Sequence, residues 1–173
     1  MGFVKYIKED EFLPDVIHVS HSTFRDPRGS IWTSYDVDLA SKIKKFTDHT
    51  FSHDKFALNG KNVLRGIHGD DKSWKLVTVV NGRAFQVVVD CRKSSESFLR
   101  FTGFYLDSNR PTSVLVPPGY GNAFLSLTEE TVYHYKLAYD GSYIDADEQF
   151  SIKWNDPFFN IKWFTDEPIL SER

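Results

Sequence analysis

The sequence feature that most constrains the fold is a pair of β-rich runs, KLVTVV and RAFQVVVD, joined by Asn81 and Gly82. Valine and phenylalanine favour strands, and Asn-Gly between two such runs is typical of a type I′ turn. These residues predict a β-hairpin over 75–90 and a fold built largely from strands.

Further strand-like runs recur at even spacing, separated by turn-forming stretches such as DSNRP and PPGYGN. They are VIHVS (16–20), SIWTSY (30–35), TFSHDKFAL (50–58), NVLRGIH (62–68), FLRFTGFYL (98–106), SVLVPP (113–118), NAFLSL (122–127) and TVYHYKLAY (131–139). Regular short strands of this kind predict a single all-β domain over 1–173, a sandwich or a barrel.

One segment has helical rather than strand periodicity. In DVDLASKIKKF, Leu39, Ile43 and Phe46 recur at intervals of three and four residues, behind Asp36 or Asp38 as a cap. The tail from 154 to 170 is rich in Pro, Asp and aromatic residues, and we expect irregular chain or short helical turns packed over the barrel.

Composition narrows the class of partner. The net charge is −3 and the two signs are mixed along the chain, so we expect no nucleic-acid partner. No apolar run is long enough to span a bilayer, and charges interrupt the N-terminus, so we expect neither a membrane partner nor a signal peptide. The lone cysteine, Cys91, excludes an intrachain disulfide and fits a cytoplasmic protein.

Three polar residues stand out in or beside strands: Arg65, His68 and Lys75. A lone histidine is more often a structural residue. However, a basic side chain that points into a barrel is costly unless it meets an anion. Strand alternation can bring these three side chains together, which suggests a pocket for a negatively charged substrate.

The sequence also bears on a metal site, an acid and a second phosphate contact. No two histidines have the spacing of metal ligands, so we expect no metal. Tyr135 lies in the aromatic run TVYHYKLAY and could act as an acid opposite a histidine, although a core role is the alternative. Arg28, in FRDPRGSIW, fits either a local ion pair or phosphate recognition.

Six motifs occur in the order found in the dTDP-4-dehydrorhamnose 3,5-epimerase family, which the chain resembles over nearly its whole length. They are FRDPRGSIW, NVLRGIHGD, KLVTVVNGRAFQVVVDCR, LVPPGYGNAF, YHYKLAY and IKWNDPFFNIKW followed by PILSER. The resemblance implies a double-stranded β-helix, the cupin or jelly-roll barrel. It also implies no metal, no cofactor and a homodimer that exchanges N-terminal strands.

The family's chemistry, carried onto this sequence, implies a role for each polar residue. A ketone at C4 of a nucleotide-linked sugar acidifies the protons at C3 and C5. His68 would be the base, Tyr135 the opposing acid, and Lys75 would stabilise the enolate. The residues implied to bind substrate are Arg65, for the diphosphate, and Arg28, Phe24, Lys55, His53 and Asn122.

Departures from the family pattern bear on the nucleotide. The usual Gln and Asn two residues apart are His53 and Lys55 here, and the usual His of the PPGFAHGF motif is Asn122. The sequence looks more like the branch acting on GDP-linked 4-keto-heptoses in capsular polysaccharide synthesis. The family pairs its base with an aspartate beyond its LS-x-K/R motif; either that aspartate or another carboxylate, such as Asp90, is expected to orient His68.

Two other functions remain open at this point. A cupin-type 3,4-ketoisomerase uses the same enolate chemistry and moves the ketone. A non-catalytic cupin that binds sugar nucleotides would need no acid and base pair. Inversion at C3 alone, or at both C3 and C5, is also open.

Overall fold

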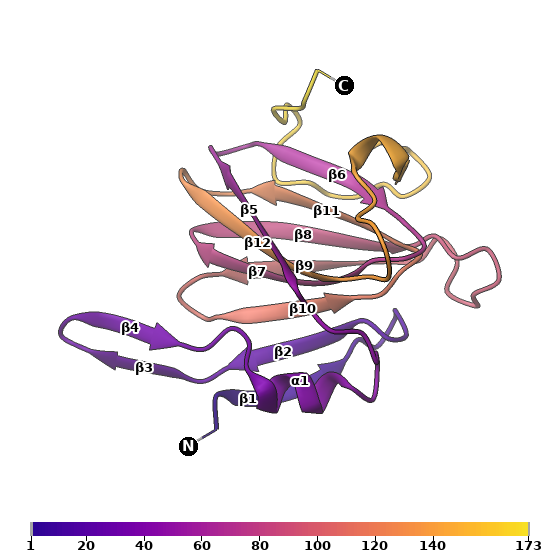
Figure 1. The fold of residues 1–173 in the computed structure, drawn as a ribbon. Helices are drawn as coiled ribbons and strands as arrows, with labels where there is room; N and C mark the ends of the chain where they lie inside the picture. Colours follow the sequence, from indigo (N-terminus) through magenta and orange to yellow (C-terminus); the bar gives the residue numbers. More distant parts are fainter. Residues whose placement is uncertain (1, 173) are drawn as a thin grey trace.

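The computed structural model describes residues 2–172, which form two antiparallel sheets that face each other (Figure 1). One sheet has the order β1 (Val4–Glu9), β2 (Ile17–His21), β10 (Thr112–Val116), β7 (Trp74–Asn81), β12 (Thr131–Ala138), β5 (His53–Asn59). The other has the order β13 (Phe150–Ser151), β6 (Leu64–Gly69), β11 (Tyr120–Ser126), β8 (Arg83–Asp90), β9 (Phe101–Asp107). The predicted jelly-roll barrel is confirmed.

The predicted hairpin at Asn81 and Gly82 is wrong. Strand β7 pairs with β10 and β12, whereas β8 pairs with β9 and β11, so the tight connection passes from one sheet to the other. A type I′ turn needs positive φ at both central residues, and only Gly82, at 76°, has it. Both strands are largely buried, which suits the middle of two separate sheets.

The N-terminal third also differs from the sequence prediction. Strand β1 was not predicted, because charged residues break its apolar pattern. The FRDPRG stretch lies within a hairpin formed by β3 (Thr23–Asp26) and β4 (Gly29–Trp32). This hairpin pairs with neither main sheet and stands away from the barrel (Figure 1).

The helix forms where its periodicity predicts, as α1 (Val37–Ile43). Asp36 caps it by accepting a hydrogen bond from the Leu39 amide at 2.8 Å. Leu39 and Ile43 pack on the outer face of the six-stranded sheet. The helix ends before Phe46, which continues the same apolar cluster from the following turn.

The tail covers the outer face of the other sheet. Residues 154–170 are irregular chain with turns, as expected. The 3-10 turn η1 (Ala146–Glu148) and the short strand β13 precede them and were not predicted. Phe159, Ile161 and Trp163 pack there against Ile67 and Val87. Because both outer faces are covered, apolar contacts identify which side of each strand faces inward. Within residues 2–172, no helix is long and apolar enough to cross a membrane.

Candidate active site

Lys75 and Tyr135 face the space between the two sheets. Leu76 packs beneath α1, and Val77 lies in the inner core, so alternation places Lys75 on the inner side with Val77. Tyr135 packs against the same inner core and lies opposite Val77 on the neighbouring strand. The inner face of the six-stranded sheet thus carries both the Lys75 amine and the Tyr135 phenol.

Arg65 and His68 come from the facing sheet, and an irregularity in β6 places both on its inner side. They are three positions apart along β6, but their partners on β11, Phe124 and Asn122, are only two positions apart. Phe124 lies in the inner core, and Ile67 packs outside. The extra residue therefore lets two side chains that simple alternation would separate share one face.

Gly66 explains why a glycine interrupts this strand. Its φ is 117°, a region that residues with a side chain rarely adopt. A Cβ atom there would lie 2.6 Å from the Ala123 Cα, so glycine also permits the close approach of β6 to β11. The RGIH sequence is thus the means by which Arg65 and His68 are brought to one site.

Arg65, on β6, contacts β5, the end strand of the six-stranded sheet. Its Nε donates to Asn59 Oδ1 at 2.7 Å, and its charge acts on Tyr135. Burial raises the pKa of Tyr135 above its ordinary value, and Arg65 offsets part of that rise. Tyr135 is therefore protonated at neutral pH and able to donate a proton. His68, on the same strand as Arg65, is exposed.

Strand β5 carries two more of the predicted residues. His53 Nδ1 and the Tyr139 hydroxyl are 2.9 Å apart, and Lys55 Nζ donates to the Tyr143 hydroxyl at 3.3 Å. Lys55 lies directly opposite Tyr135 across the strand pair. Asn122, opposite His68, accepts a hydrogen bond from Gln86 Nε2 at 2.7 Å. The structure therefore brings His53, Lys55 and Asn122 to the site.

Phe24 and Arg28 do not join the other predicted residues within this chain. Both lie on the β3–β4 hairpin, away from the barrel (Figure 1). Phe24 is 62% exposed, and the Arg28 guanidinium is paired with Asp26. The sequence allowed two roles for Arg28, and one of them, a local ion pair, is present at this turn.

Asp90, which the sequence suggested could orient His68, has both carboxylate oxygens bonded to neighbouring groups. Oδ1 accepts the Arg92 Nε at 3.0 Å, and Oδ2 accepts Arg92 Nη2 and the hydroxyls of Ser95 and Ser97. Burial raises the pKa of Asp90, but these bonds more than offset it and hold the pKa below its ordinary value. Asp90 instead anchors the loop between β8 and β9.

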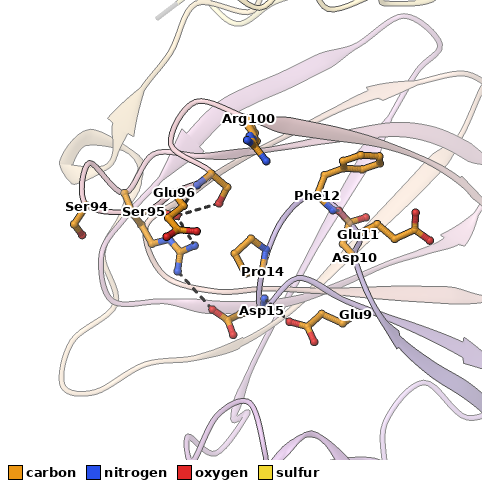
Figure 2. Close-up of a pocket in the computed structure, with 12 residues that line it drawn as sticks. Glu9, Asp10, Glu11, Phe12, Pro14, Asp15, Ser94, Ser95, Glu96 and Arg100 are labelled. Carbon is orange, nitrogen blue, oxygen red and sulfur yellow. Dashed lines mark hydrogen bonds and ion pairs between the residues drawn. The ribbon is translucent and has the colours of Figure 1, made fainter.

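That loop borders a separate open hollow of about 640 Å³ beside the β1–β2 turn (Figure 2). It is lined by Glu9, Asp10, Glu11, Phe12, Pro14, Asp15, Arg92, Ser94, Ser95, Glu96, Ser97 and Arg100. None of the predicted site residues lines it. Its many carboxylates make it a poor receptor for a nucleoside diphosphate.

Sequence reasoning missed three residues that support the site. Asn59 holds Arg65, Tyr143 contacts Lys55, and Asp70 lies 3.4 Å from Lys75 Nζ. Asn59 was detectable, since it is a polar residue two positions after the inward-facing Ala57 on β5. Tyr143 and Asp70 lie in loops, where no periodicity indicates which way a side chain points.

A comparison with known families decides the assignment of this barrel. The family model described as dTDP-4-dehydrorhamnose 3,5-epimerase matches residues 10–173. The chain belongs to this family. It is therefore an isomerase, an epimerase of sugar nucleotides.

Individual relatives agree with the family match. A dTDP-4-dehydrorhamnose 3,5-epimerase of Salmonella typhimurium is 32% identical over 167 residues, covering 93% of this chain and 88% of that protein. A dTDP-4-dehydro-6-deoxyglucose 3-epimerase of a Streptomyces species is 34% identical over 134 residues, covering 72% and 67%. The crystal structure of dTDP-4-dehydrorhamnose 3,5-epimerase from Bacillus anthracis, with TDP and PPi bound, matches this epimerase with a TM-score of 0.85 and 29% identity, covering 96% and 95%.

Proposed function

We propose that this epimerase inverts C3, and also C5, of a nucleotide-diphosphate-linked 4-keto sugar, with His68 as base and Tyr135 as acid. The observation that carries the proposal is their placement on facing sheets. His68 lies on the inner side of β6 and Tyr135 on the inner side of β12. A sugar ring between them would meet a base on one face and an acid on the other.

The proposed steps conserve protons. The C4 ketone acidifies the C3 proton, which His68 removes, and the electron pair left on C3 forms an enolate whose charge lies on O4. The Lys75 ammonium stabilises that oxyanion. Tyr135 then returns a proton to the opposite face of C3, and solvent restores both side chains. The same sequence at C5 gives the second inversion.

For the nucleotide, we propose a GDP-linked 4-keto-heptose, used in the synthesis of a surface polysaccharide such as a capsule. The support is the departure from the family pattern at His53, Lys55 and Asn122, which all lie at the site. The relatives named above are dTDP-sugar enzymes, so a dTDP-linked 4-keto-6-deoxy sugar is the competing substrate.

A substrate panel tests both parts of this proposal. Purified enzyme is incubated with dTDP-, GDP- and CDP-linked 4-keto sugars, and the products are identified by proton NMR. We expect the highest kcat/KM with the GDP-linked heptose. Preference for a dTDP sugar would refute the nucleotide assignment alone. A product with the ketone at C3 would indicate a ketoisomerase, and binding without turnover of any sugar would indicate a non-catalytic cupin.

Arg65→Ala is expected to raise KM by about tenfold or more, because a charge-assisted bond to the diphosphate is worth about 1.5–3 kcal/mol. Steady-state kinetics on the preferred sugar measure this change. Arg83→Ala removes an arginine that reaches only the Tyr105 hydroxyl at the surface, and it should leave KM unchanged. A wild-type KM in folded Arg65→Ala would remove Arg65 from the phosphate site.

We also propose that the enzyme is a homodimer in which the β3–β4 hairpin crosses to the other subunit. The hairpin is unpaired with either main sheet, and β5 ends the six-stranded sheet with a free edge. Ile31 on the hairpin is 70% exposed, and Phe56 and Leu58 on β5 are 63% and 69% exposed. Such an exchange would bury these apolar side chains and carry Phe24 and Arg28 toward the candidate active site of the other subunit.

The dimer is tested by mixing two inactive variants. His68→Asn and Arg28→Ala, each inactive or impaired alone, should regain part of the wild-type activity when mixed and allowed to exchange subunits. Half of the sites in a mixed dimer then combine an intact His68 with an intact Arg28. Light scattering that shows a monomer, or no regain of activity in a proven mixed dimer, would contradict the exchange.

A further inference from the structure

Lys75 is an ammonium enclosed at the inner end of the site. Its side chain is 7% exposed. Across the neighbouring strands it faces Val116 on β10 and Leu137 on β12, both apolar. Such an environment disfavours a charge, and burial lowers the pKa of Lys75.

Asp70 accepts a hydrogen bond from Lys75 Nζ, at 3.4 Å. It is even more enclosed, with its side chain 2% exposed. Oδ1 accepts the backbone amides of Lys72 and Ser73 at 3.0 and 2.6 Å, and Oδ2 faces Lys75. The loop therefore fixes the carboxylate, and the carboxylate in turn fixes Lys75.

We propose that Asp70 is the positioning residue of Lys75, holding the ammonium in its charged form and aimed into the barrel so that it can stabilise the enolate oxygen. This inference rests on the proposed function, which gives Lys75 its task. An ammonium has three donors, and Asp70 engages one of them. Two donors thus remain for the developing oxyanion. Asp70 itself transfers no proton and does not contact the reacting atoms in this proposal.

Asp70 is the negative charge that lies against Lys75 and opposes the effect of burial. Strands β10 and β12 place apolar residues directly against Lys75. Tyr135, two residues before Leu137 on β12, is kept neutral by burial. On the facing sheet, Arg65 and His68 on the inner side of β6 are further ionisable groups. Gln149, from the η1 segment, adds only a neutral amide 3.5 Å from Asp70 Oδ2.

The sign of the pH effect follows from these contacts. Burial lowers the pKa of Lys75, and the Asp70 charge raises it in part. Without that charge, Lys75 would lose its proton at a lower pH, and the enolate would lose its cation. The alkaline limb of the pH–rate profile should then move toward acid, whereas a merely structural defect would lower kcat equally at every pH.

Asp70→Asn tests this prediction while preserving the loop, because the Asn side-chain oxygen can still accept the Lys72 and Ser73 amides. We expect kcat to fall on the alkaline side toward the roughly 100-fold loss that removal of an oxyanion donor causes, with KM within about threefold of wild type. The matched control is Asp71→Asn, the same change at the exposed neighbour, which should leave the profile unchanged. A uniform loss at all pH values, or no loss, would overturn the inference.

Two further measurements separate this inference from the proposed function. NMR titration of the Lys75 Cε signal should show its midpoint at lower pH in Asp70→Asn than in wild type; an unmoved midpoint overturns the role of Asp70 alone. Lys75→Gln with wild-type turnover would instead overturn the role of Lys75. Should Asp70→Asn fail to fold, Asp70→Glu keeps the charge and is expected to retain the wild-type alkaline limb; a shifted limb there overturns the inference.

Discussion

His68→Asn is expected to lower kcat by about 10,000-fold, the upper range for loss of a general base. An Asn side chain cannot accept a proton near neutral pH, so neither inversion nor exchange of the C3 proton can begin. The measurement is proton NMR in deuterium oxide, which follows inversion and solvent exchange together. The fold should survive, because His68 is exposed and its backbone pairing with β11 and β13 does not depend on the ring.

The matched control is His53→Asn, the same substitution at the first residue of β5. His53 contacts Tyr139 and Tyr143 and lies at the start of β5. It is proposed to bind the nucleotide, so KM should rise while kcat stays within about threefold of wild type. Turnover near the wild-type level in His68→Asn, or an equal loss of kcat in His53→Asn, would disprove the assignment of His68 as the base.

The sequence predicted the strands better than their partners. Short β-branched and aromatic runs mark strands wherever both faces are apolar, which is why β7, β8, β11 and β12 were found. Pairing depends on long-range packing, and Asn-Gly is equally suited to a local hairpin and to a tight passage between two sheets. Val77 and Val88 meet in the inner core from opposite sheets, and that contact is invisible in a local pattern.

The catalytic candidates were easier to predict than the groups that hold them. Arg65, His68 and Lys75 stand out because a charged or titratable residue in an apolar strand requires an explanation. Asp70 lies in a polar loop, where carboxylates are common, and only the structure shows its side chain to be enclosed. The same limit applies to Asp90, whose position in an apolar run indicated burial but not that its carboxylate bonds Arg92 and Ser97.

Tyr135→Phe is expected to remove inversion by at least about 100-fold, the usual contribution of a positioned acid, while leaving exchange of the C3 proton in place. Proton removal by His68 does not require the phenol, so the enolate still forms and takes deuterium back on the face from which the proton left. Starting material labelled at C3 would thus accumulate without product. The loss of exchange together with inversion would show that Tyr135 is also needed to form the enolate.

Tyr133→Phe provides the matched control, since its ring centroid lies only 4.9 Å from that of Tyr135. The Tyr133 hydroxyl is buried without a hydrogen-bond partner among residues 2–172, so its removal should leave turnover within about twofold and should not lower the melting temperature. Loss of inversion in this variant would indicate that the whole aromatic cluster, rather than one phenol, sets the rate.

The number of inverted centres depends on how far the Tyr135 hydroxyl can move. Its ring is held by Tyr133 and by the inner core, so its position should be stiff. His68 is exposed, so on the proposed function it could reach C5 if the sugar tilts. In deuterium oxide, the wild-type enzyme should therefore incorporate deuterium at C3 first and at C5 more slowly. Equal inversion of both carbons by Tyr135→Phe at the wild-type rate would mean that another group delivers the proton.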